Sequence, residues 1–242
     1  MPTLLTRSTF ENLARVRNEL IRQGFVPASA DRPGVAGLFL PWVGQNLAEA
    51  GGIYWVGAAT EGAYGADDEQ SFETCHERGA RLCDRGPHAR AHTPLWLFLD
   101  GLTRELLGGP YDTTTMWWGW SNLLKIGWSA GEPEGWSAEL VERQQRACAL
   151  ALREEFGQLR NSLVFIGSLG DFGILGEALG GAPTWHGREQ GEAAGPWWFR
   201  NEASGNLFAH GSHPSAARRG HFSREALDRT VLLSRNLLPR FA

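Results

Sequence analysis

The sequence predicts an α/β fold with three layers, in which helices cover both faces of a central, mainly parallel β-sheet. Short apolar runs alternate with longer helical segments along the chain, a pattern typical of strand–helix–strand units. Several apolar runs end in loops of glycine, alanine and serine, as the strands of an open sheet do. With 242 residues, 42% of them hydrophobic, the chain is long enough to bury one substantial core.

Apolar runs bounded by turn residues predict strands at residues 53–56, 162–166, 197–199 and 207–209, with a weaker apolar run at 38–42. Apolar periodicity and start signals predict helices at residues 8–21, 68–82, 94–106 and 137–159, a short one ending at 179, and a last one at 223–238. The first helix is expected to begin at Ser8, because Ser8 and Glu11 have the spacing of a capping box.

We expect residues 1–242 to form a single domain, with residues 1–50 as an N-terminal helical extension packed on it, because no repeat or convincing linker divides the chain. No run approaches the roughly 20 apolar residues of a membrane span, and the N-terminus lacks the layout of a signal peptide. Three cysteines are a sparse, odd-numbered set that fits a reducing cytosol better than a disulfide framework. These features predict a cytoplasmic monomer without a membrane partner.

The charge of the chain is unevenly distributed. The net charge of -4 argues against a protein that coats nucleic acid by charge alone. From residue 200 onward, however, the sequence contains seven arginines and only three acidic residues. This stretch could form a local basic face that binds phosphates, or it could be an ordinary solvated helix face.

Two loops of small residues carry the polar groups that could form a site, and each follows a predicted strand. Residues 57–69 begin with small residues and end with acidic ones. This pattern is found in loops that bind a phosphate or a nucleobase, but many other strand–helix loops share it. Residues 206–220 hold two histidines, two serines and an arginine pair, and Pro214 fixes a backbone angle next to His213. Both loops are expected at the carboxyl edge of the sheet, where open α/β folds build their sites.

Four segments resemble, in order, the motifs of the uracil-DNA glycosylase superfamily. Residues 53–57 and the loop after them resemble the first motif, in which a strand ends in a glycine before the water-activating group. Residues 120–125 resemble the segment whose asparagine, here Asn122, reads the flipped base. Residues 163–167 resemble the third core strand, and His213-Pro214-Ser215 resembles the second motif, whose histidine faces the base. The match covers most of the chain from about residue 50, as scattered motifs.

The resemblance implies a DNA glycosylase that flips a base out of the DNA stack and hydrolyses its N-glycosidic bond. His213 would donate to the departing base, and Glu61 would position the water, although Glu61 could equally be an acid that complements a helix dipole. Residues implied to line the base pocket are Gly57, Ala59, Tyr64, Asn122, Ser168 and His210. Residues implied to contact DNA are Ser215, Arg218 and Arg219.

The first motif departs from the family pattern. Family members place an Asp, Asn or Glu one or two positions after the glycine and usually a proline next, whereas this chain has Ala58, Ala59 and Thr60. The departure predicts a modified or bulky base as substrate rather than plain uracil. Relatives that attack chemically modified phage DNA make antiviral defence, for instance against modified cytosines, the expected setting.

Other interpretations of the sequence stay open. The chain could be a nucleic-acid-binding module that has lost the chemistry, or an N-glycoside hydrolase acting on free nucleosides or nucleotides. A zinc site could be built from Cys75, Cys83, His88 and His92, although the spacing of the two cysteines is unusual. The iron–sulfur cluster of some superfamily branches needs four cysteines, and this chain has three. We therefore expect no metal and no cofactor, with DNA as the partner.

Overall fold

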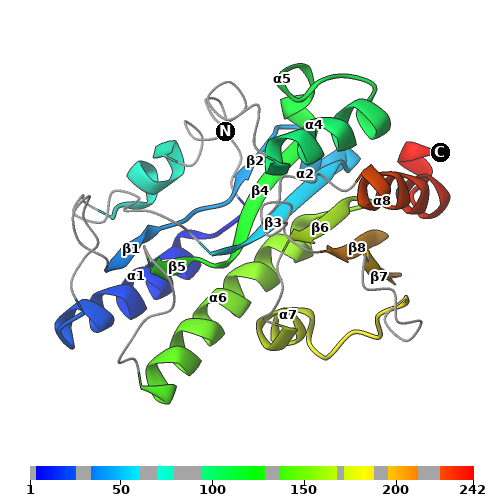
Figure 1. Ribbon diagram of the computed structural model, residues 1–242. Coiled ribbons are helices and arrows are strands. Elements are labelled where there is room, and N and C mark those ends of the chain that lie inside the picture. The colour runs from blue at the N-terminus through cyan, green and yellow to red at the C-terminus, as the bar shows by residue number, and fades with distance from the viewer. Residues whose placement is uncertain are drawn as a thin grey trace.

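The computed structural model describes residues 4–25, 34–59, 70–78, 94–128, 137–167, 172–187, 196–211 and 224–242. These residues form a mixed α/β fold whose central six-stranded sheet is mainly parallel and has helices on both faces (Figure 1). The predicted fold class is therefore confirmed. None of the helices in the described ranges is long and apolar enough to cross a membrane.

The sheet has the strand order β2-β4-β3-β6-β8-β7. Its four inner strands run parallel to one another: β3 (Ile53–Ala59), β4 (Trp118–Leu124), β6 (Leu163–Gly167) and β8 (Asn206–Gly211). The two outer strands, β2 (Trp42–Val43) and β7 (Trp197–Asn201), are antiparallel to their neighbours. A separate two-stranded sheet pairs β1 (Val35–Leu38) with β5 (Ile126–Trp128). All four parallel strands therefore end at one edge of the main sheet.

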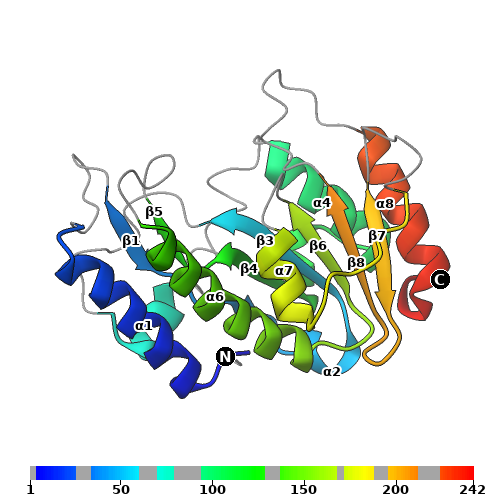
Figure 2. The ribbon, with the colours of Figure 1, turned by 90° about the horizontal axis from the view of Figure 1, so that it is seen from below.

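Helices α4 (Pro94–Leu107) and α8 (Arg224–Leu237) cover one face of the sheet, and α6 (Ala138–Gln158) and α7 (Phe172–Leu179) cover the other (Figures 1 and 2). Helix α1 (Arg7–Arg22) packs against α6. Short helices complete the described chain: α2 (Leu47–Ala50), α5 (Tyr111–Thr114), the 3-10 turns Thr115–Trp117 and Pro239–Phe241, and a turn of helix at 72–78.

Strand β3 shows why the sheet is buried on both faces. Ile53 and Trp55 pack into the cluster beneath α4 and α8, whereas Tyr54 and Val56 pack into the cluster beneath α6 and α7. Neighbouring residues of a strand point to opposite faces, so a strand that is apolar at every position needs a cover on each side. The continuous apolar run at 53–56 thus correctly predicts a central strand with helices on both faces.

The helical predictions are largely confirmed, with one correction at the first helix. Helices α4, α6, α7 and α8 lie where the sequence places them. Helix α1 begins at Arg7 rather than Ser8, because the side chain of Thr6 accepts a hydrogen bond from the backbone N–H of Thr9 and so caps the helix. The helix expected at residues 68–82 is described only over 72–78.

Two strand features were not predicted. Residues 118–124 form β4, although the aromatic run there was not expected to be a strand. The segment 1–50 is more than a helical extension, because β2 pairs with β4 in the main sheet and β1 pairs with β5. The N-terminal region is therefore built into both sheets.

Candidate functional site

The candidate site lies at the carboxyl edge of the parallel strands, where a single register row crosses the sheet. Asn122 of β4 is the Cα partner of Gly57 in β3, Gly57 is the partner of Gly167 in β6, and Gly167 is the partner of Gly211 in β8. The row therefore consists of one amide side chain, that of Asn122 on β4, followed by one glycine on each of the next three strands. Residues paired in this way share one face of the sheet.

Asn122 lies on the face covered by α4 and is held against the sheet. A Cβ atom added to Gly57 would come within 2.6 Å of the Asn122 Oδ1, so only glycine leaves room for the amide there. Trp120, two residues earlier on the same face, donates from its Nε1 to the same oxygen over 3.4 Å. Asn122 is only 5% exposed. The carboxamide is thus set in one orientation at the strand end, as a group that reads a base edge would need to be.

Beside the amide, two buried aromatic rings lean over the other glycines of the row. The Trp55 ring occupies the space where a Gly167 side chain would be, and the Phe165 ring lies 3.0 Å from the corresponding position at Gly211. The two rings stack on each other at 5.2 Å with an angle of 12° between their planes. Phe98 of α4 packs against both rings. The glycines therefore accommodate a rigid aromatic layer beneath the edge.

Asn122 and His210, both predicted to line one pocket, are not brought together. His210 belongs to strand β8 rather than to the loop after it. Its buried ring stacks on Trp197 at 5.4 Å and meets Trp185 edge-on at 5.8 Å, on the face of the sheet covered by α7. Since Asn122 lies on the α4 face, the sheet separates the two side chains. His210 serves here as a buried aromatic partner.

Gly57 and Ala59, which the sequence places in the loop after the predicted strand 53–56, belong to β3, because this strand continues to Ala59. The remaining predicted site residues lie outside the described residues: Glu61, Tyr64, Ser168, His213, Ser215, Arg218 and Arg219. In the sequence, Glu61 comes two residues after the end of β3, Ser168 directly after β6, and His213 two residues after β8.

The arginines of α8 do not form an open basic face. Arg224 pairs with Asp228 at 2.9 Å, Arg229 with Glu225 at 2.8 Å, and Arg235 with Glu105 of α4 at 3.2 Å. These are exposed ion pairs, which contribute little stability but neutralise the charge of the helix surface. For this helix, the interpretation as a solvated, ion-paired face fits better than that of a phosphate-binding stripe.

Of the four residues that could have formed a zinc site, only Cys75 is described. It is buried against Phe10 and Leu13, and this burial raises the pKa of its thiol to about 11. A metal ligand must be a thiolate, so this environment opposes the role. No group of three His, Cys, Asp or Glu side chains in the described ranges could hold a metal ion. Cys83, His88 and His92 lie outside those ranges.

A buried charged network lies on the other face, directly behind Asn122. Lys125, the only lysine of the chain, is fully buried with Glu155 of α6, at 2.7 Å between Nζ and Oε1. The hydroxyl of Tyr54 donates to the other oxygen of Glu155 over 2.7 Å. Burial raises the pKa of Tyr54 and lowers that of Lys125, the latter against the opposing effect of the Glu155 carboxylate. No motif in the sequence marks Lys125 for this buried position.

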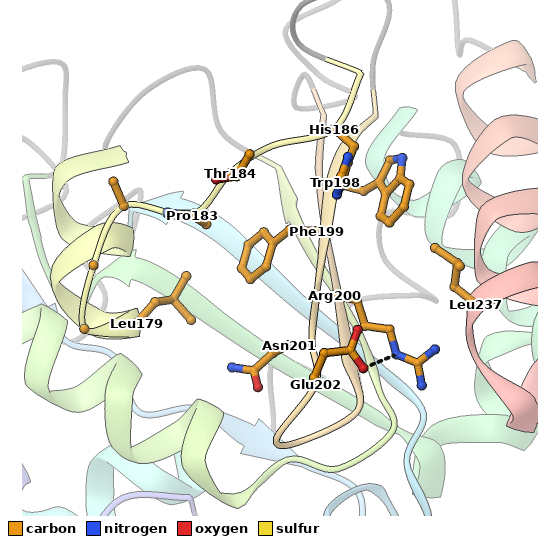
Figure 3. A pocket seen from close by; sticks show the side chains of 13 residues that line it. Leu179, Pro183, Thr184, His186, Trp198, Phe199, Arg200, Asn201, Glu202 and Leu237 are labelled. Carbon is orange, nitrogen blue, oxygen red and sulfur yellow. Dashed lines mark ion pairs between the residues drawn. The ribbon is translucent and has the colours of Figure 1, made fainter.

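A large groove lies away from this edge, along the outer side of β7 (Figure 3). Its volume is about 720 Å³, and its rim includes one long ion pair, 3.9 Å between Arg200 and Glu202. It is lined by residues 179–184, His186, residues 198–202 and Leu237. Gly57, Ala59, Asn122 and His210, the predicted site residues that the structure describes, do not line it, so we take the strand edge as the candidate site.

Comparison with known proteins supplies no relative: no protein-family model matches the sequence, and no curated protein matches it with significant similarity.

Proposed function

We propose that this chain is a DNA glycosylase, which flips a base out of DNA and hydrolyses its N-glycosidic bond. The observation that carries the proposal is the register row Asn122–Gly57–Gly167–Gly211. This row sets the amide of Asn122, which would read the base, at the edge of the sheet, and Glu61, Ser168 and His213 follow the ends of β3, β6 and β8 in the sequence. The resemblance to the uracil-DNA glycosylase superfamily requires these elements at one edge.

The chemistry needs a group for each charge that develops as the bond breaks. The departing base becomes negative, and His213 would donate a hydrogen bond to it. The sugar becomes positive, and the carboxylate of Glu61 would favour that charge and orient the attacking water. Asn122 offers both a donor and an acceptor, so its fixed carboxamide could select the base that enters the pocket. No metal or cofactor takes part in this scheme.

The substrate we propose is a modified base in place of plain uracil. Ala58 and Ala59 stand at the usual position of the water-activating residue, so the sequence has no polar group there. A site that lacks the usual group would suit a base other than plain uracil. Modified cytosines of phage DNA are such bases, which would make defence against phage the setting.

The test is an excision assay on duplex and single-stranded oligonucleotides carrying uracil or one of a panel of modified bases, including hypermodified cytosines. Alkali then cleaves the DNA wherever a base has been lost. We expect strand breaks on at least one modified substrate. Asn122→Ala and His213→Ala should each slow excision about 10²- to 10³-fold, since each removes a group that would bind the base or its anion.

Asn12→Ala, on the outer helix α1 and far from the sheet edge, is the matched control and should keep the wild-type rate. Three results would contradict the proposal in different ways. Binding of modified DNA without base loss would indicate a binding module. Hydrolysis of free nucleosides or nucleotides alone would indicate the monomer enzyme. Excision that neither Asn122→Ala nor His213→Ala slows would refute the site.

A further inference from the structure

The ammonium of Lys125 has three polar partners. It forms an ion pair with Glu155 Oε1 at 2.7 Å, it donates to the backbone carbonyl of Asn122 over 2.8 Å, and it donates to the hydroxyl of Ser121. The ammonium is completely buried, so the ion pair and the two hydrogen bonds together offset the loss of its hydration. Both hydrogen-bond acceptors belong to the end of β4, which presents Asn122.

The carbonyl of Asn122 points toward the outer side of β4. The backbone N–H of Gly44, next to β2, donates to the carbonyl of Trp118 over 2.6 Å, which shows that this carbonyl points toward β2. Carbonyl directions alternate along a strand, so the carbonyl of Asn122 points the same way as that of Trp118. Strand β2 begins at Trp42, opposite Trp120, and therefore does not extend as far as Asn122, where the Lys125 ammonium donates to the carbonyl over 2.8 Å.

The network also fixes the ammonium in three dimensions. Glu155 lies on α6, and its second oxygen accepts from the hydroxyl of Tyr54 on β3 over 2.7 Å. Lys125 therefore ties the end of β4 to a helix and to the central strand at once. Apolar side chains could fill the same volume with equal stability, but they would not fix a direction.

We infer that Lys125 is a positioning residue for Asn122: its ammonium, held by Glu155, fixes the backbone of Asn122 so that the carboxamide on the opposite face is presented to the substrate base. This rests on the proposed function. Lys125 is not a catalytic residue, since it is completely buried and lies on the face of the sheet away from the Asn122 side chain. Its effect reaches the base only through the end of β4.

The test uses the double variant Lys125→Met/Glu155→Gln, which removes both buried charges together. Single-turnover excision and DNA affinity are measured on the modified substrate, and the side-chain amide resonance of Asn122 is followed in asparagine-labelled protein, with Asn122→Ala for assignment. We expect the resonance to move or broaden and excision to slow about tenfold or more, because a small misplacement of a positioned group costs rate. DNA affinity should stay within about twofold, since phosphate contacts dominate it.

Arg17→Met is the matched control, because Arg17 is also buried and also donates to a backbone carbonyl, that of Ala36, over 2.9 Å. It should leave the Asn122 resonance and the excision rate unchanged. If the double variant does not fold, Tyr54→Phe keeps the ion pair, removes the hydroxyl that donates to Glu155, and should shift the same resonance by less.

Unchanged Asn122 resonance in the double variant, or in Tyr54→Phe where the double variant does not fold, overturns the inference. So does a shifted resonance with a wild-type excision rate. If the wild-type protein excises no base, the proposed function fails, and the resonance alone then decides whether Lys125 positions Asn122.

Discussion

At the scale of single residues, Gly57 and Asn122 fit closely together in the candidate site. We predict that Gly57→Ala displaces the carboxamide, because the new Cβ would lie 2.6 Å from Oδ1. Crowding of this kind in a packed region costs about 1–3 kcal/mol. Urea unfolding should show that loss, and the excision assay should show a rate reduced in the manner of Asn122→Ala.

Gly157→Ala provides the comparison, since nothing lies within 4 Å of the added Cβ near the end of α6. Alanine is favoured over glycine in a helix by about 1 kcal/mol, so this variant should be at least as stable as the wild type. A Gly57→Ala protein as stable and as active as Gly157→Ala would show that Asn122 is not constrained by β3.

Cys75 gives a prediction for alkaline pH. Its folded-state pKa of about 11 lies above the ordinary value of 9.0, because burial disfavours the thiolate. The stability that the buried neutral thiol contributes is therefore fully present below pH 9 and is lost as the pH rises from 9 toward 11. The difference in unfolding free energy between the wild type and Cys75→Ala should shrink by about 1 kcal/mol between pH 8 and pH 10. A difference that stays constant over this range would contradict the burial argument.

The residue scale also shows where prediction from sequence stops. Asn122 could be singled out through the resemblance of residues 120–125 to the superfamily segment whose asparagine reads the base. The face of His210 could not, because the predicted strand ends at residue 209, two residues before the end of β8 at Gly211. Successive residues of a strand point to opposite faces, so placing His210 in the loop instead of in the strand assigned a buried aromatic partner of Trp197 to a predicted pocket.

At the scale of elements, the start of α1 provides a direct test of a corrected boundary. Thr6→Ala should cost about 1 kcal/mol of stability, because the Thr6 side chain caps the backbone N–H of Thr9. Ser8→Ala should change stability by less than about 0.5 kcal/mol, since Ser8 is an exposed residue in the first turn. Thermal or urea unfolding of the two variants would measure this, and a larger loss in Ser8→Ala would restore the capping box expected from the sequence.

Helices were more predictable than strands because their signals are local. Ser137, predicted as the start of a helix, does cap α6 by accepting from the backbone N–H of Leu140. Strand β4 gives no such signal, since Trp118 and Trp120 fit a helix or a strand equally well and no turn residue marks its start. Its place between β2 and β3 depends on pairing with Gly57 and its neighbours, and such partners far along the chain leave no mark in a short window.

At the scale of the whole molecule, the distribution of charge decides how DNA affinity should depend on salt. The arginines of α8 are already paired, so Arg224→Gln/Arg229→Gln should leave the salt dependence of DNA binding unchanged. Arg218→Gln/Arg219→Gln should lower the slope of log affinity against log salt by about 1–2, because each phosphate that an arginine neutralises adds about 0.9 to that slope. Binding titrations at several salt concentrations would measure both slopes. Equal effects of the two double variants would contradict this assignment.

The fold class could be derived from sequence because it follows from the alternation of apolar strands and helices. What could not be derived is which side chains share a face at the sheet edge. That depends on the register between β3, β4, β6 and β8, and the register is set by packing, for example of the Trp55 ring over Gly167.

The arrangement of the parallel strands also bears on how the chain is made. Ile53 pairs with Trp118 on one side and with Leu163 on the other, so β3 leaves the ribosome long before either neighbour exists. Until β4, β6 and the helices on both faces have been synthesised, the uncharged apolar segment of β3 stays exposed. During that time, association with other nascent chains competes with native strand pairing. Slow synthesis at low temperature, or ample chaperone, should therefore raise the yield of folded protein more than any change to the surface.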